Sequence, residues 1–185
     1  EDGASESSRI AAEYAALQRE FLRLTGTARP RVPRFEDVAD ALPFNAAAVD
    51  FYVYPRYQET FTDGSPWGEP ELVAWVFVAG DTYPHRVNLG PVEPLQEAVE
   101  SYLDYLVPTR GGRALGGKQA RPGASLRELL WDPLKEHLGE ASTVFVSPDS
   151  FLATLPLETL PVGKEEFLIE EHSFVYSQDL VSLAT

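Results

Sequence analysis

The sequence predicts an α/β fold preceded by a small antiparallel hairpin sheet and an N-terminal helix. Three observations support this prediction. Apolar residues near the start recur at helical spacing, a central region is rich in β-branched and aromatic residues, and two short, continuously apolar runs follow predicted helices. Runs of the last kind, at residues 143–146 and 173–176, are typical of strands buried on both faces of a parallel sheet.

Residues 5–24 are predicted to form one amphipathic helix. Its apolar positions recur at steps of four and three, and Gly26 stands where a helix-ending glycine is expected. These positions are Ile10, Tyr14, Leu17, Phe21 and Leu24. The proline-containing residues 27–33 then form a linker, so we expect two parts: residues 1–33, helix and linker, and residues 34–185, the α/β domain.

Residues 48–54, 71–78 and 82–89 are expected to form β-strands, and the last two of these to form an antiparallel hairpin. The last two runs are separated by Ala79-Gly80-Asp81, which is a turn signal. Residues 94–107 then show the spacing of a helix.

Residues 108–124 are predicted to be a flexible basic loop, because they carry five glycines, two prolines and no acidic residue. Residues 112–119 fit G-x-x-x-x-G-K, but Gln119 replaces the Ser or Thr that would hold magnesium. We therefore interpret the segment as a basic loop, in which Arg110–Arg121 are also accessible to a processing protease.

The next helix is predicted to open with a capping box at residues 125–128 and to run to Leu138. Asp132-Pro133 should break it, and Gly139 should end it.

Composition excludes several classes of function. The chain has 15 basic and 29 acidic residues and a net charge of −14, which argues against partners such as nucleic acid or an anionic membrane. There is no Cys, so neither a disulfide nor a cysteine nucleophile lies within these residues. We find no membrane helix and no signal peptide, and expect a soluble, cytoplasmic protein. The chain begins at Glu1 and contains no Met, so we expect a piece of a longer protein.

Ser147-Pro148-Asp149-Ser150 is the main candidate site, because it directly follows a predicted buried strand. Loops at the carboxyl ends of parallel strands carry the sites of α/β folds. Two interpretations stay open: a turn in which Asp149 bonds its own backbone, and a substrate contact by Ser147 and Asp149.

Other groups of residues give weaker evidence for a functional site. His85, His137 and His172 show no metal spacing, and we expect neither metal nor cofactor. A Ser147–His172–Asp149 triad can be written, but no G-x-S-x-G motif accompanies it. The acidic pairs, such as Glu165/Glu166 and Glu170/Glu171, are expected on a solvated face.

Residues 144–161 (VFVSPDSFLATLPLETLP), followed by Leu168-Ile169-Glu170-Glu171 and residues 174–177, resemble the CHAT domain. This family is similar to caspases and separases and is often joined to tetratricopeptide helices. The resemblance covers roughly residues 35–180. The chain departs from the family at Ser150, where Gly is usual, and at Leu157, where Phe is common.

The resemblance implies a caspase-like three-layer sandwich and, in active members, a cysteine peptidase. Residues 34–185 would be the first part of that domain, truncated before its catalytic His and Cys. In such a dyad the imidazole activates a thiolate nucleophile. This chain contains no Cys, so the resemblance assigns no catalytic residue to it. Ser147 and Asp149 are implied to bind substrate, and Asp149 could pair with a basic side chain.

Two functions follow from this resemblance. The first is part of a cysteine endopeptidase that acts by limited proteolysis in bacterial signalling or defence. Its partners would be the C-terminal half of the same domain, a protein substrate, and a tetratricopeptide or sensor module. The alternative is a non-catalytic scaffold for protein–protein contact. An unrelated α/β fragment would be favoured if the two apolar strands were not parallel neighbours.

Overall fold

The computed structural model describes Ala16, Leu17, Glu20, Arg23 and residues 33–58, 66–106 and 122–184. The chain divides into two compact units, Glu1–Val32 and Pro33–Thr185. Four residues of the predicted helix 5–24 are described, and all four are helical. The rest of that helix, and the predicted basic loop up to Arg121 with its G-x-x-x-x-G-K motif, lie outside the described residues.

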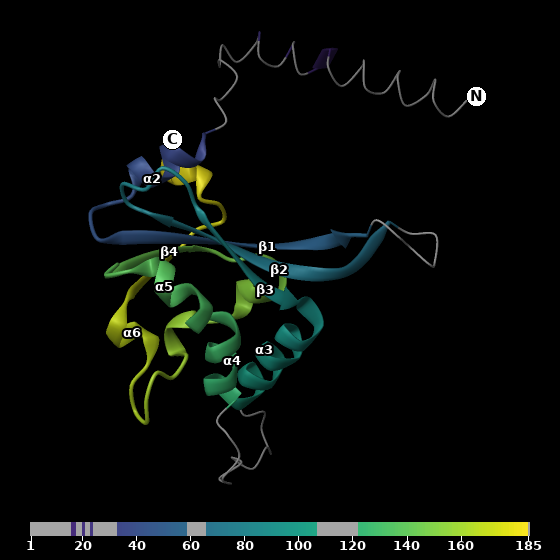
Figure 1. Cartoon of the computed structure of the whole chain (residues 1–185), viewed down its shortest axis with the longest axis vertical. Helices are drawn as coiled ribbons and strands as arrows, with labels where there is room; N and C mark the ends of the chain where they lie inside the picture. The colour runs from purple at the N-terminus through teal and green to yellow at the C-terminus, as the bar shows by residue number, and fades with distance from the viewer. Residues whose placement is uncertain are drawn as a thin grey trace, which may run out of the picture. The chain divides into compact units, whose positions relative to one another are not determined.

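The second unit begins with α2 and three consecutive strands, and helices then separate these from two further strands (Figure 1). Its strands are β1 (Ala46–Tyr57), β2 (Trp67–Val78), β3 (His85–Pro91), β4 (Thr143–Ser147) and β5 (Ser173–Tyr176). Its α-helices are α2 (Phe35–Ala41), α3 (Val92–Leu106), α4 (Pro122–Leu130), α5 (Lys135–Leu138) and α6 (Leu168–Glu171). Its 3-10 turns are η1 (Asp132–Leu134), η2 (Ser150–Thr154), η3 (Leu157–Thr159) and η4 (Val181–Ala184).

All five strands form one mixed sheet in the order β3-β2-β1-β4-β5. The pairs β1–β2 and β2–β3 are antiparallel, whereas β1–β4 and β4–β5 are parallel. The predicted hairpin is therefore continuous with the parallel strands instead of forming a sheet of its own. The two apolar strands are parallel neighbours, which removes the observation that would have favoured an unrelated fragment.

Helices cover the two faces of this sheet unequally. Figure 1 shows α3, α4, α5 and α6 on one face and α2 with the C-terminal turn on the other. The larger core lies under α3–α5, where sheet residues such as Val49 and Val146 meet Leu126, Leu130 and Trp131. Every one of these five side chains is fully buried, so burial on this face supplies most of the apolar stabilisation. The arrangement is a three-layer α/β sandwich.

The second face is covered at one end only. Ala46, Ala48 and Phe77 are buried there beneath Val38 of α2 and Leu180. Farther along β1 on the same face, Tyr52 is 56% exposed. Side chains alternate along β1, so Ala46, Ala48 and Tyr52 point to this face while Val49 and Phe51 point to the other.

The predicted helix boundaries need one correction. We expected the helix after the basic loop to begin with a capping box at residues 125–128, but α4 begins at Pro122. Proline is favoured in the first helical turn, because its ring presets the helical φ and it lacks the N–H that would be left unpaired there. The predicted break at Asp132-Pro133 is confirmed by η1, and Gly139 ends α5 with a φ of 56°.

The burial predicted for the last strand is wrong. Residues 173–176 do form a strand, but Ser173, Val175 and Tyr176 are exposed. β5 is an edge strand of the described sheet, so only β4 covers one of its sides. No helix in the described part of the chain is long and apolar enough to cross a membrane.

Candidate functional site

The candidate site lies where β4 ends beside a longer strand. β1 and β4 pair in parallel only as far as Asp50 and Ser147, and β1 then continues to Tyr57. Beyond this point the Val53 N–H donates to Oδ2 of Asp149 at 2.8 Å. The Asp149 carboxylate thus replaces the strand acceptor that β4 no longer provides.

This contact corrects one interpretation of the loop. A turn in which Asp149 bonds its own backbone was expected, but its carboxylate instead bonds a strand 96 residues away. Ser150, the next residue, has a φ of 54°, a left-handed conformation that favours glycine. The reversal at Ser150 starts η2 and holds Asp149 against β1.

Asp50 occupies the middle of β1, on the same sheet face as Ser147. Ser147 is the register partner of Asp50 on β4, and it is only 5% exposed. Burial raises the pKa of Asp50, the Ser147 hydrogen bond opposes this rise, and the charges of Asp149 and Asp179 add to it.

Asp179 comes from the turn that follows β5. The Ser177 N–H donates to the Val146 carbonyl at 2.9 Å, which extends the β4–β5 ladder by one residue. The Ser177 hydroxyl then donates to the Asp179 carbonyl at 2.7 Å, and the Ser182 N–H donates to Oδ1 of Asp179 at 2.8 Å. These bonds fix the turn at the carboxyl end of β5.

We call Asp50, Ser147, Asp149 and Asp179 the carboxyl-end cluster. The charges of Asp149 and Asp179 both act on Asp50 there, and within the described ranges none of the three carboxylates forms an ion pair with a basic side chain. Such an arrangement favours a cationic group, because a positive charge would relieve the mutual repulsion of the carboxylates. Among the described residues, no group of three or more His, Cys, Asp or Glu is arranged to hold a metal ion.

The Ser147–His172–Asp149 triad is not assembled. His172 precedes β5 and its Nδ1 lies 2.8 Å from the Ala141 carbonyl, at the amino ends of the strands. Ser173 pairs with Thr143, and Ser147 lies four residues beyond Thr143, so Ser147 and Asp149 at the carboxyl ends are more than roughly 13 Å from His172 at about 3.3 Å per residue.

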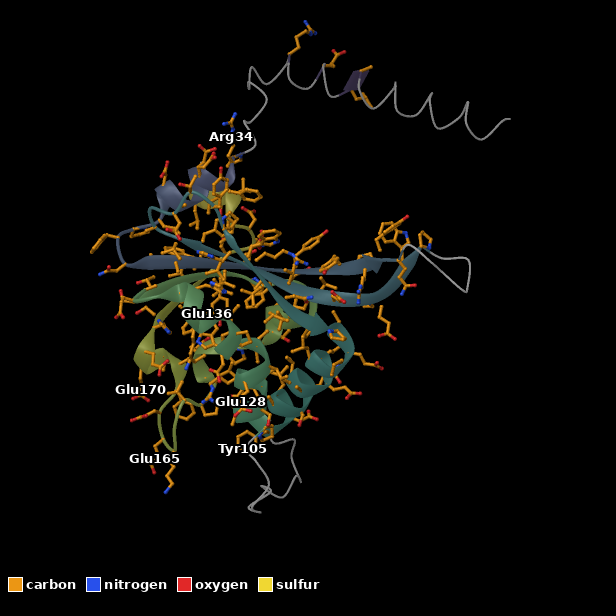
Figure 2. All side chains as sticks on the ribbon, in the orientation of Figure 1. Arg34, Tyr105, Glu128, Glu136, Glu165 and Glu170 are labelled. Atoms are coloured by element: carbon orange, nitrogen blue, oxygen red, sulfur yellow. The ribbon has the colours of Figure 1, made fainter. Side chains whose placement is uncertain are left out.

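The remaining histidines and acidic pairs lie elsewhere. The rings of His85 and His137 stack with centroids 4.8 Å apart, each beside its own carboxylate, Asp81 or Glu136. Figure 2 shows Glu165 and Glu170 at the surface of the helical layer. Both are exposed, as are Glu166 and Glu171, which confirms the solvated face predicted for these pairs.

Sequence reasoning proposed Ser147 and Asp149 as candidates, and it did not single out Asp50 or Asp179. Asp50 left a signal, because it is the one charged residue in the otherwise apolar and aromatic residues 46–54. A charge within a buried strand calls for a partner or a function. Asp179 left none, since an acidic residue after a strand is usual for a turn.

Comparison with protein families gives one match. Residues 120–184 match the family model described as the CHAT domain. This match confirms the resemblance for those residues, while the resemblance of residues 35–119 stays a prediction. Searches of curated proteins and of solved structures give no significant match.

Proposed function

Because residues 120–184 match the CHAT domain, we propose that this chain supplies the first part of a caspase-like cysteine endopeptidase. The match to the CHAT family suggests that the chain is related to the caspase-like clan of peptidases. The chain has no Cys, so the nucleophile and its histidine would come from polypeptide downstream of these residues. The complete enzyme would act by limited proteolysis in bacterial signalling or defence, in the cytoplasm, with a tetratricopeptide or sensor module upstream.

β5 is an edge strand of the sheet that the described residues form, and this edge supports the proposal. The strand exposes Val175 and Tyr176, and the neighbouring α6 region exposes Phe167 and Ile169. An edge strand with exposed large apolar side chains favours the addition of further structure. A parallel strand added beside β5 would carry its following loop to the same end of the sheet as the carboxyl-end cluster.

The carboxyl-end cluster carries the proposal about substrate. Ser147 and Asp149 would contact the substrate, and Asp50 and Asp179 would add negative charge beside them. A Lys or Arg side chain fits this chemistry best, because its charge would pair with the clustered carboxylates. The substrate would therefore be a protein with a basic residue near the scissile bond.

The test begins with the native gene product. Mass spectrometry under denaturing conditions should find a segment carrying His and Cys, either continuous with Thr185 or co-purifying as a second chain. That assembly should cleave peptides with a basic residue in preference to matched neutral peptides. Asp179→Asn should raise KM for the basic peptides at least tenfold and leave KM for the neutral ones unchanged.

The matched control is Glu165→Gln, which removes the same charge from an exposed site on the helical layer. A native protein without a Cys-bearing segment would refute the peptidase. If Asp179→Asn leaves KM for the basic peptides unchanged, only the assignment of the cluster to a basic substrate is refuted.

A non-catalytic scaffold is the second candidate, and the observation that favours it is the absence of Cys from the 185 residues. In that case the β5 edge and the exposed Phe167 and Ile169 would bind a protein partner. Stable binding of a partner by a native product that lacks Cys would support the scaffold.

A further inference from the structure

α2 and η4 pack against each other on the sheet face opposite the main helical layer. Val38, Leu42 and Leu180 are 5%, 7% and 5% exposed, and Leu183 and Ala184 pack against them. These two segments are far apart in the sequence yet side by side in space (Figure 1). Burial of these side chains is therefore shared between the first helix and the last turn of the unit.

The same last turn holds part of the carboxyl-end cluster. Leu180 directly follows Asp179, and the Ser182 N–H donates to the Asp179 carboxylate. Residues 177–182 thus have two attachments to the body of the protein. One is the Ser177 N–H bond to the Val146 carbonyl, and the other is the burial of Leu180 in the cluster that α2 and the sheet form together.

α2 has little stability of its own. It spans seven residues, and a helix so short depends on packing for its stability. Its N-terminus is capped locally, since the Arg34 N–H donates to Asp37, while Phe35 is 57% exposed and stacks on Trp75 with ring centroids 6.3 Å apart. A short element with one buried face is the kind that opens before the rest of a domain.

We propose that α2 acts as a clasp. By packing with Leu180 it keeps residues 177–182 ordered, and it thereby fixes the position of Asp179 relative to Asp50. The chain preceding Pro33 joins α2 directly, so a pull or a binding event there reaches the cluster through Leu180. The charge of Asp179 acts on Asp50, so opening of the clasp changes the charge that the cluster presents. The regulatory meaning rests on the proposed function, but the coupling itself is measurable without any activity.

Native-state hydrogen exchange of the 185-residue chain in increasing urea tests the clasp without a mutation. The Val38, Leu42 and Ser182 amides should open together, with one free energy and one urea dependence, before the β4 amides open. Independent opening of Ser182 and α2 would overturn the clasp. Opening of all these amides only together with β4 would overturn it as well.

Val38→Ala gives a second test, with Asp40→Ala as its matched control on the exposed side of α2. In Val38→Ala the Ser182 amide should exchange at least tenfold faster than in the parent chain, with β4 exchange unchanged. The pKa of the Asp50 carboxyl, followed by carbon NMR, should fall because the Asp179 charge moves away. Asp40→Ala should change neither quantity.

Unaltered Ser182 exchange and an unaltered Asp50 pKa in Val38→Ala would contradict the proposal. If Val38→Ala does not fold, the urea series on the parent chain decides. If α2 and Ser182 open together but the native protein has no peptidase activity, only the proposed function is refuted. If the native protein is an active peptidase but α2 and Ser182 open independently, only the clasp is refuted.

Discussion

Gly123→Ala should destabilise the domain, although alanine is the better helix former. Gly123 is the second residue of α4 and is buried. A Cβ added there would lie 2.6 Å from Cε2 of Tyr102 and 2.7 Å from Cδ of Pro161. Ordinary carbon contacts are about 3.5–4.0 Å, so one of these neighbours would have to move.

Neither neighbour is free to retreat. The Tyr102 ring is 2% exposed, and its hydroxyl donates to the Thr159 carbonyl at 2.6 Å. The carbonyl of Pro161 accepts a hydrogen bond from Arg127 at 2.9 Å, and Arg127 also pairs with Asp132. A shift of either ring therefore disturbs a bond that ties Thr159 of η3 to α3, or Pro161 to α4.

Two opposing effects determine the change in the free energy of unfolding for Gly123→Ala. Replacing glycine by alanine within a helix stabilises by up to about 1 kcal/mol, and less in the first turn. Overpacking a filled core costs roughly 1–3 kcal/mol. We expect a net loss of about 1–2 kcal/mol, which in a domain of this size lowers Tm by roughly 2–4 °C per kcal/mol.

Thermal and urea unfolding followed by circular dichroism would measure this loss. Gly68→Ala is the matched control, because a Cβ there meets the end of the Gln58 side chain, which is exposed and flexible. It should change the free energy of unfolding by less than about 0.5 kcal/mol. A Gly123→Ala protein that is as stable as the parent, or more stable, would refute the reasoning that packing outweighs helix propensity at this position.

Three further predictions concern the site. Ser150→Gly should raise the free energy of unfolding in urea by roughly 0.5–1 kcal/mol. The substitution relieves a left-handed φ that costs about 1–2 kcal/mol in residues other than glycine, but it also increases the entropy of the unfolded chain. A lower free energy of unfolding would count against strain at Ser150. Asp149→Ala should cost about 1–3 kcal/mol by leaving the Val53 N–H without an acceptor, whereas Asp149→Asn should cost less because it keeps an acceptor oxygen; equal losses would show that the hydrogen bond is not what matters. The pKa of Asp50 is raised in the folded state, so the native protein holds its proton to higher pH than the unfolded chain, and stability is lost as pH rises through that raised pKa. Asp50→Asn should therefore stabilise the fold at pH 7 relative to the parent and lose this advantage below pH 3.8, as measured by urea unfolding at both values.

Local patterns predicted the elements better than their surroundings. The α/β class, the strand at residues 143–146, the break at Asp132-Pro133 and the end at Gly139 all follow from periodicity, proline and glycine. The exposure of β5 does not, because an apolar run has the same appearance whether it is central or at an edge of the sheet. The Asp149–Val53 bond was also out of reach, since it depends on how far β1 extends past β4.

The unequal lengths of β1 and β4 explain how Asp149 can be both structural and available. β4 stops at Ser147, so β1 presents an N–H at Val53 that needs an acceptor. Asp149 supplies one carboxylate oxygen, Oδ2, and this contact holds the loop in place. A carboxylate has two oxygens and about four lone-pair sites, so the bond to Val53 leaves Oδ1 able to accept from a ligand. The fixed orientation favours such binding, because a carboxylate already held by the fold loses little further freedom when a cationic side chain arrives. Asp149→Asn separates the two roles: it keeps an acceptor for Val53 and removes the charge, so a fold that survives while basic peptides bind less tightly would assign both roles to one side chain.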